Sequence, residues 1–222
     1  FGRLWHEVAT DDEVRVILLT GAGKVFCAGG HLKRFAEGES VSELSQTELS
    51  PITWRTWLST PQPMIAAVNG DAIGFGTSLA VACDIVVTSS TARFGSPHVK
   101  LGIVPASNVG LWPTLMGLLQ AKEYLMTGNL FSADEAYRLG LANRVVEPNE
   151  VMAQAQSLAA ELLALPYNPV RWTKKVLNKA RLDMWSLNYD LAQSYESMAT
   201  ASPEHHAAVA AFAARSQPKA TK

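Results

Sequence analysis

Along the first half of the chain, apolar residues occur either in continuous stretches or at helical spacing. Unbroken apolar and β-branched stretches at residues 14–20 and 64–69 are typical of strands buried on both faces of a parallel sheet. Between them, Trp54, Trp57 and Leu58 recur at helical spacing. By the same criteria we expect helices at 1–9 and 77–83 and further strands at 84–88, 92–95 and 143–146. Strands that alternate with helices predict an α/β domain with mostly parallel pairing.

The chain becomes helical after Pro105. Ser202, Pro203 and Glu204 provide a helix cap, a proline at the first helical position and an acid in the first turn, so they predict the start of a last helix. Apolar periodicity predicts the helices of this half at 109–116, 119–127, 132–139, 149–164, 168–181, 183–199 and 202–214. These helices have more apolar faces than one domain needs, which predicts packing on the core or on another subunit. We divide the chain into an α/β core (1–146), a helical region (147–216) and a tail (217–222).

Composition and charge narrow the class of protein. The 222 residues are 48% hydrophobic and carry a net charge of −1 without a basic block, so we expect one globular domain and no nucleic-acid partner. Cys27 and Cys83 fit neither a disulfide framework nor a zinc pattern, and no metal site is expected. We expect both cysteines to be buried free thiols, which fits a reducing, cytoplasmic setting. Apolar runs are shorter than the roughly 20 residues of a membrane span. The chain begins at Phe1 without a methionine, in what reads as the middle of a helix, so we expect its natural N-terminus to lie further upstream.

Two glycine turns carry the candidate chemistry, at residues 28–32 (Ala-Gly-Gly-His-Leu) and 70–76 (Gly-Asp-Ala-Ile-Gly-Phe-Gly). Each follows an apolar, β-branched run, and the second continues into a helical pattern. A strand that turns at glycine into a helix leaves backbone N–H groups without partners at the helix start. Two such turns that face each other would direct two N–H donors at one point. This is the construction of an oxyanion hole, which stabilises a carbonyl oxygen as it becomes negative.

With these motifs, the chain resembles the crotonase, or enoyl-CoA hydratase/isomerase, superfamily. The matching stretches are 14–32, 63–87, 92–105 and 127–146. The resemblance implies a crotonase-like spiral of ββα repeats with a C-terminal helical oligomerisation region, assembled as a trimer or a dimer of trimers. It also implies an enzyme of fatty acid metabolism whose substrate is a coenzyme A thioester. Coenzyme A would enter as part of that substrate, and no tightly bound cofactor is expected.

The resemblance also assigns roles to individual positions. The two oxyanion donors would be the N–H groups of Gly30 and Phe75. Gly74 and Gly76 would let the backbone approach the thioester closely. Arg215 would reach a phosphate of coenzyme A from the last helix, or it is a solvated charge at a helix end. The other substrate-binding positions would be Lys24, Ala28 and Leu32 along the adenine end of coenzyme A, and Ala106, Ser107 and Asn108 near the acyl group, with Ser107 and Asn108 orienting a water or a substrate hydroxyl.

The chain departs from the family at the acids. Four positions at which relatives often carry a carboxylate are His31, Ser78, His98 and Ala106, so hydration through a pair of glutamates is not expected. Because histidine titrates near pH 6.5, His98 and then His31 are the candidates for proton transfer, and a structural histidine is the alternative. Ser78 lies where Clp-type serine proteases of the same spiral fold carry their nucleophile, and it could pair with His98 or be a small inert residue of the acyl pocket. We expect the doublet His205-His206 at the surface.

Three functions are compatible with the sequence. The first is an acyl-CoA hydratase, isomerase or lyase that stabilises an enolate. The second is a non-catalytic acyl-CoA binding protein that keeps the oxyanion hole without the acids. The third is a thioesterase that uses Ser78 and His98. The acyl group cannot be inferred, because four aromatic residues could line a pocket or fill a core: Trp54, Trp57, Phe75 and Trp112.

Overall fold

A four-stranded parallel sheet lies at the centre of the protein. The computed structural model describes residues 2–30 and 51–216. The sheet has the order β1-β2-β4-β7, with each strand parallel to its neighbour. Its strands are β1 (Ile17–Thr20), β2 (Met64–Val68), β4 (Ile85–Ser89) and β7 (Arg144–Val146). The predicted α/β architecture with parallel pairing is confirmed, although β1 is shorter and less buried than the run at 14–20 suggested.

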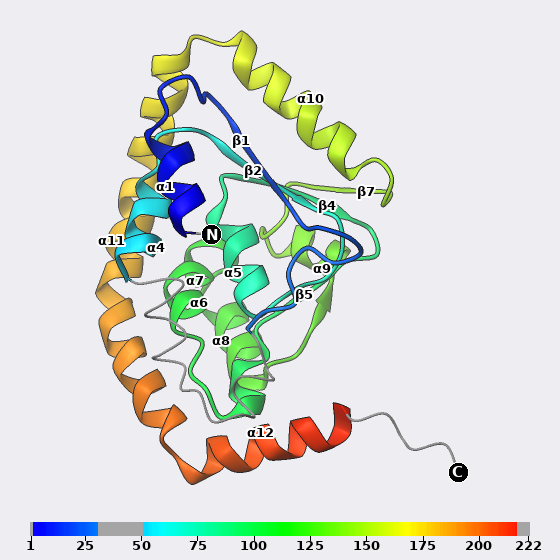
Figure 1. Ribbon diagram of the computed structural model, residues 1–222, viewed down its shortest axis with the longest axis vertical. Coiled ribbons are helices and arrows are strands. Elements are labelled where there is room, and N and C mark those ends of the chain that lie inside the picture. Colours follow the sequence, from blue (N-terminus) through cyan, green and yellow to red (C-terminus); the bar gives the residue numbers. More distant parts are fainter. Residues whose placement is uncertain (1, 31–50, 217–222) are drawn as a thin grey trace.

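Two helices cover opposite faces of this sheet (Figure 1). On one face, Ile65 and Ala67 of β2 pack with α10 (Val151–Ala164). On the other face, Ala66 and Val68 belong to the main core, which includes residues of α5 (Phe75–Ala82). Successive side chains of a strand point to opposite faces, so β2 supplies both cores. This explains its unbroken apolar sequence.

A second, smaller sheet stands next to the glycine turns. It consists of β3 (Ala72–Ile73), β5 (Arg93–Gly95) and β6 (Phe131–Ser132), with β3 parallel and β6 antiparallel to β5. The sequence predicted β5 alone, because strands of two residues are too short to show alternation. This sheet holds the second glycine turn (70–76), because β3 lies inside that turn and Gly74 directly follows β3.

The remaining helices pack around these sheets (Figure 1). Tryptophan side chains fill the space between several of them: Trp5 stacks on Trp57 with ring centroids 4.1 Å apart, and Trp54 meets Phe75 edge-on at 5.8 Å. Trp54, Trp57 and Trp112 are buried core residues, and Phe75 is half-buried beside them. The helices are α1 (Gly2–Thr10), α4 (Pro51–Ser59), the 3₁₀ helix η1 (Pro97–Leu101), α6 (Ala106–Leu111), α7 (Pro113–Met116), α8 (Leu118–Thr127), α9 (Ala133–Arg138) and α12 (Pro203–Ser216).

One long helix, α11 (Tyr167–Thr200, 34 residues), replaces the two helices expected at 168–181 and 183–199. Neither glycine nor proline lies between those two segments, so nothing in the sequence breaks the helix there. Lys174 ties α11 to the sheet, since its Nζ lies 2.7 Å from Asp84 Oδ2 and donates to the carbonyl of Gln62 at 2.7 Å. Asp84 also accepts the backbone N–H of Met64 at 2.7 Å.

The last helix, α12, packs against η1 and corrects one surface expectation. His205 is buried at 5% exposure and bonds through Nδ1 to the carbonyl oxygen of Leu101 at 2.7 Å, whereas His206 is exposed as expected. Gly102 makes room for this contact, because a methyl group on it would lie 2.9 Å from the Cα of His205. The expectation of a surface position was therefore wrong for His205.

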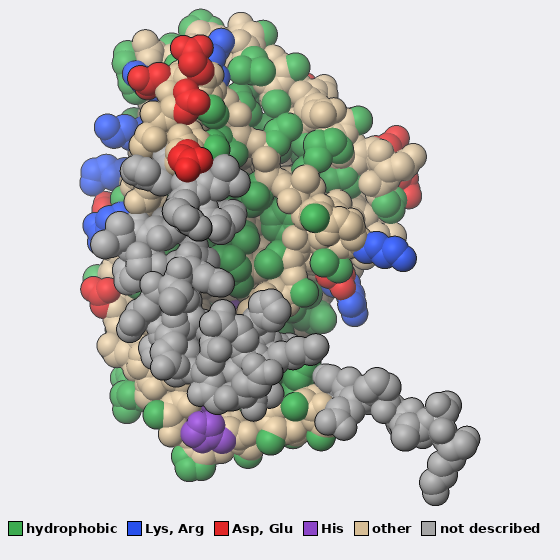
Figure 2. Space-filling view, in the orientation of Figure 1, with side chains coloured by type: hydrophobic (Ala, Val, Ile, Leu, Met, Phe, Trp, Pro, Cys, Tyr) green, Lys and Arg blue, Asp and Glu red, His purple; other side chains and the backbone are tan. Residues whose placement is uncertain are grey.

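The described surface shows no large patch of one charge in the view of Figure 2, where acidic and basic side chains lie mostly along the edges and hydrophobic ones between them. Among the helices of residues 2–30 and 51–216, none combines the length and the apolar content required to cross a membrane. Cys27 and Cys83 are both free thiols, as predicted; Cys83 is buried, whereas Cys27 is half-buried, so the expected burial was wrong for Cys27.

Candidate active site

The two glycine turns are held side by side by backbone hydrogen bonds. The carbonyl of Asp71 accepts the N–H groups of Phe26 and Cys27, both at 3.1 Å, and the N–H of Ile73 donates to the carbonyl of Cys27 at 2.9 Å. Cys27 and Ala72 form a parallel bridge. The segment before the first turn therefore runs beside β3, and both segments reach their glycine turns at the same edge.

Glycine is required where the turns touch. Gly29 and Gly74 have φ angles of +95° and +60°, a region that other residues rarely adopt. A methyl group on Gly76 would overlap the carbonyl oxygen of Cys27 and lie 2.9 Å from its carbonyl carbon. The absence of a side chain at Gly76 thus lets α5 pack directly on the chain that leads into the first turn.

The N–H of Phe75 points out of the start of α5. The helix begins at Phe75, two residues earlier than predicted, and Gly74 at the N-cap has no side chain to cap it. Groups of the first helical turn have no partner within the helix, and no described residue accepts the Phe75 N–H. Gly29 faces this group, because a methyl group on Gly29 would lie 3.8 Å from Phe75 N. Gly30 follows Gly29 directly, and the role of its N–H stays a prediction.

The imidazole of His98 completes the arrangement. A methyl group on Gly74 would lie 3.5 Å from His98 Cε1, 3.8 Å from His98 Nε2 and 3.9 Å from the Cα of Gly29. The Cε1–Nε2 edge of the ring therefore lies beside Gly74, on the side where Gly74 meets Gly29. Burial lowers the pKa of His98 to about 4, so the ring is neutral at pH 7. The pKa of His98 is thus lower than the unperturbed value of 6.5, and the role of His98 in proton transfer stays a prediction.

The other edge of the His98 ring is attached to a chain of buried polar side chains. Ser96 Oγ lies 2.7 Å from His98 Nδ1, Asn108 Nδ2 donates to Ser96 Oγ at 2.9 Å, and Ser78 Oγ donates to Asn108 Oδ1 at 2.8 Å. Ser78 is 2% exposed, and Ser96 and Asn108 are fully buried. Asn108 was predicted to contact the substrate, but both its amide oxygen and its amide nitrogen form hydrogen bonds with protein side chains. Ser96 was not predicted, and its spacing of two residues from His98 is the one local signal for it.

The direct contact that a nucleophilic Ser78–His98 pair requires is not formed among the described residues. The Ser78 hydroxyl bonds to Asn108 and lies 3.3 Å from the carbonyl oxygen of Gly74. Asn108 and Ser96 stand between Ser78 and the ring, so His98 cannot take the Ser78 proton directly. Ser78 is a buried structural hydroxyl in this arrangement.

The remaining predicted positions are placed less fully. Ala106 is buried at the start of α6, and Ser107 beside it is half-buried. Lys24 and Ala28 are exposed on the segment before the first turn. His31 and Leu32 lie outside the described residues, and of Arg215 the structure describes only a place in the last turn of α12.

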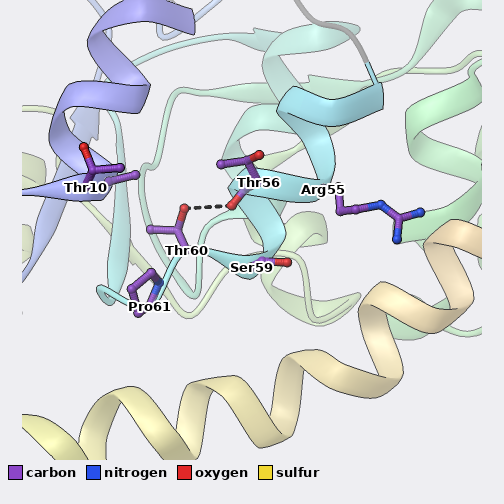
Figure 3. Close-up of a pocket in the computed structure, with 7 residues that line it drawn as sticks. Thr10, Arg55, Thr56, Ser59, Thr60 and Pro61 are labelled. Atoms are coloured by element: carbon purple, nitrogen blue, oxygen red, sulfur yellow. Dashed lines mark hydrogen bonds between the residues drawn. The ribbon is translucent and has the colours of Figure 1, made fainter.

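A hollow of about 300 Å³ lies elsewhere, between α1 and α4 (Figure 3). Thr60 Oγ1 donates there to the carbonyl of Thr56 at 2.9 Å, and Arg55 points away from both. Its lining residues are Ala9, Thr10, Arg55, Thr56, Ser59, Thr60 and Pro61. None of them belongs to the glycine turns, so this hollow is distinct from the candidate site. The described part of the chain holds no group of three or more histidine, cysteine or acidic residues suited to a metal ion.

Comparisons with known proteins identify the family of the chain. The sequence profile of the Enoyl-CoA hydratase/isomerase family matches residues 3–221. The chain is 36% identical over 195 residues to a short-chain-enoyl-CoA hydratase of Clostridium acetobutylicum, covering 87% of this chain and 73% of that protein. It is 32% identical over 222 residues to a 1,2-epoxyphenylacetyl-CoA isomerase of Escherichia coli, covering 97% of this chain and 84% of that protein.

A solved structure gives the same result for the fold. The crystal structure of an enoyl-CoA hydratase/isomerase from Mycobacterium paratuberculosis superposes with a TM-score of 0.87 at 34% identity, covering 95% of this chain and 85% of that chain. The fold of this protein and its sequence thus both match the same family. The protein belongs to the enoyl-CoA hydratase/isomerase family of the crotonase superfamily.

Proposed function

We propose that the protein is an acyl-CoA enzyme that stabilises a thioester enolate where its two glycine turns meet His98. The observation that carries this proposal is that the Cβ position of Gly74 lies within 4 Å of both the His98 ring and Gly29, while the Cβ position of Gly29 lies 3.8 Å from Phe75 N. Relatives in the family are named for reactions of coenzyme A thioesters, namely hydration of enoyl-CoA and isomerisation of epoxyphenylacetyl-CoA. A thioester carbonyl is the group that two backbone donors at such a point would bind.

Each of the possible reactions passes through an enolate, in which the thioester oxygen carries a negative charge. In Cα exchange, a water molecule in the site takes a proton from Cα of an acyl-CoA, and the C–H electron pair moves toward the carbonyl, whose oxygen becomes negative. In hydration, the oxygen of a water molecule adds to Cβ of a 2-enoyl-CoA and gives the enolate of the 3-hydroxyacyl-CoA, and a proton of that water is delivered to Cα. The N–H groups of Gly30 and Phe75 would donate to this oxygen. Removal of one such donor costs about 3 kcal/mol of transition-state stabilisation in other enzymes.

His98 would act on the reacting end of the substrate through Nε2. Its low pKa keeps the ring neutral at pH 7, so it offers a hydrogen bond without a charge. Ser78 and Ala106, at the other positions where relatives often carry acids, are buried and carry no titratable group. We therefore do not propose hydration by a glutamate pair.

Coenzyme A would lie along the segment before the first turn. Lys24 and Ala28 are exposed there, which supports a role of residues 24–32 in binding the adenine end. The contribution of Arg215 to a coenzyme A phosphate and the cytoplasmic location are further parts of the proposal that rest on the sequence alone.

A homo-oligomer, a trimer or a dimer of trimers, is also part of the proposal. It is supported by large apolar side chains that α11 exposes, since monomeric proteins rarely display many of them on one helix. They are Trp172, Val176, Leu177, Leu187, Leu191 and Met198.

The proposal is tested with a panel of thioesters. Crotonyl-CoA, a 3-enoyl-CoA and a saturated acyl-CoA in D₂O report hydration, isomerisation and exchange of the Cα proton. We expect turnover or Cα exchange without release of free coenzyme A. Binding of acyl-CoA with neither exchange nor turnover would replace the proposal with the non-catalytic binding protein. Release of free coenzyme A that disappears in Ser78→Ala would replace it with the thioesterase.

A further inference from the structure

We infer that Asn108 is a positioning residue that, through Ser96, holds His98 as the tautomer with its proton on Nε2. The edge of the ring that faces the glycine turns is then a hydrogen-bond donor. This inference deepens the proposed function, because it states what His98 offers to a substrate. The tautomer itself can be measured without any substrate.

The direction of each hydrogen bond between Ser78 and His98 follows from which side-chain atoms can donate and which can accept. The Ser78 hydroxyl donates to Asn108 Oδ1, so the amide presents Nδ2, which can only donate, to Ser96 Oγ. Ser96 accepts this bond, and although its Oγ has a second lone pair, the Ser96 proton has one possible bonded partner among the described residues. That partner is His98 Nδ1, at 2.7 Å. A neutral imidazole carries one N–H, so when Nδ1 accepts, the proton is on Nε2.

Burial couples the directions of the hydrogen bonds that link Ser78, Asn108, Ser96 and His98. Ser96 and Asn108 are fully buried and Ser78 is nearly so, and an unpaired buried donor or acceptor costs about 1–3 kcal/mol. Reversal of one bond would therefore require reversal of all of them, with Ser78 donating to the carbonyl oxygen of Gly74 instead. That contact is 3.3 Å, against 2.8 Å for the bond to Asn108 Oδ1, so the geometry favours the direction described.

The consequence lies at the other edge of the ring. Nε2 is the nitrogen that faces Gly74, so its N–H is directed toward the place proposed for the thioester. A neutral N–H donates to an oxygen and cannot take a proton from carbon. His98 therefore acts on a substrate oxygen, either the thioester carbonyl or an oxygen on the acyl chain. His98→Gln, which keeps an N–H donor, should retain more activity than His98→Ala.

The test is the ¹⁵N spectrum of the full chain labelled at histidine. The His98 signals are assigned by their loss in His98→Gln, and we expect Nε2 to be protonated and Nδ1 not. A spectrum with Nδ1 protonated would overturn the inference. Asn108→Asp should reverse the tautomer, because a carboxylate only accepts, so that Ser96 donates to it and accepts the Nδ1–H of His98.

A matched variant separates this effect from a general effect of charge. Asn129→Asp adds the same charge at an exposed amide that accepts a bond from Lys100, and it should leave the His98 signals unchanged. Unchanged signals in Asn108→Asp as well would overturn the role of Asn108. Should that variant not fold, Ser96→Ala removes the same link and should give a mixture of tautomers. A pure Nε2–H signal in Ser96→Ala would equally contradict the inference.

An activity readout distinguishes the inference from the proposed function. If the enzyme turns over a thioester, Asn108→Asp should lower kcat about tenfold or more with a smaller change in KM, since it alters the group at the reacting atoms and not the coenzyme A site. An Nε2–H tautomer in a protein without turnover on the thioester panel would overturn the proposed function and leave the inference standing.

Discussion

Gly76 and Cys27 lie so close that a methyl group on Gly76 would overlap the Cys27 carbonyl oxygen. This contact sets the distance between α5 and the chain that enters the first glycine turn. The two turns can therefore face each other only while residue 76 has no side chain.

The first prediction is that Gly76→Ala destabilises the protein and separates the turns. Because backbone must move, we expect a loss of about 3 kcal/mol in the free energy of unfolding, measured with urea. Gly23→Ala is the control: its φ is +84° but no atom lies within 4 Å of the added methyl group, so only conformational strain of roughly 1–2 kcal/mol applies. Equal losses in the two variants would show that the contact with Cys27 is not tight.

The second prediction concerns the pH dependence of stability at His98. The pKa of His98 is about 4 in the folded protein, below the ordinary value of 6.5, so the unfolded chain binds the proton first as the pH falls. Folding stability should decrease by about 3 kcal/mol between pH 6.5 and pH 4, and His98→Gln should remove this part of the pH dependence. His206→Gln, at an exposed histidine, should keep it. A His98→Gln profile that runs parallel to that of the wild type would argue against a buried neutral ring.

The third prediction concerns the opposite shift at Glu196. Burial raises the pKa of this carboxyl from 4.5 to about 7, although Gln193 donates a bond to it at 3.1 Å. The unfolded chain loses this proton first as the pH rises, so stability should fall between pH 4.5 and pH 7. Glu196→Gln should therefore stabilise the protein by about 3 kcal/mol at pH 8 and leave it nearly unchanged at pH 4. Glu161→Gln is the exposed control, and a gain in that variant too would assign the effect to overall charge.

The fourth prediction compares two lysines of α11. Lys174 is buried against Asp84, whereas Lys179 pairs with Asp183 at 3.2 Å where both side chains are more than half exposed. Lys174→Met should cost about 3 kcal/mol of unfolding free energy, since it removes the cation paired with Asp84 and the donor to the carbonyl of Gln62. Lys179→Ala should cost less than about 0.5 kcal/mol. Urea unfolding of both variants gives the comparison, and similar costs would mean that Lys174 does not anchor α11.

The sequence predicted the elements whose pattern is local. The parallel sheet followed from the apolar, β-branched runs that became β1 and β2 and from the alternation of strands with helices, and the paired glycine turns were visible as motifs. The strands β3 and β6 have two residues each and left no pattern. The single helix α11 was divided in two, although no residue there breaks a helix.

Those parts of the candidate site that depend on a single recognisable residue type could be predicted from the sequence. Glycines at the turns and a histidine after them could be identified from the chain alone. The link from Ser78 through Asn108 and Ser96 to His98 could not, because it depends on α5 and α6 packing together in three dimensions. The lowered pKa of His98 could not be predicted for the same reason, since desolvation of the ring comes from the fold and not from neighbouring residues in sequence.

The most direct test of the account is the N–H of Phe75. Phe75→Pro removes this donor at the first position of α5, where proline is tolerated, and Phe75→Ala keeps the donor while removing the ring that packs on Trp54. The measurement is the rate of Cα deuterium exchange of an acyl-CoA in D₂O, with both variants shown to be folded. We predict a rate in Phe75→Pro about 100-fold or more below that of Phe75→Ala. Equal rates in the two variants would contradict an oxyanion hole at this turn.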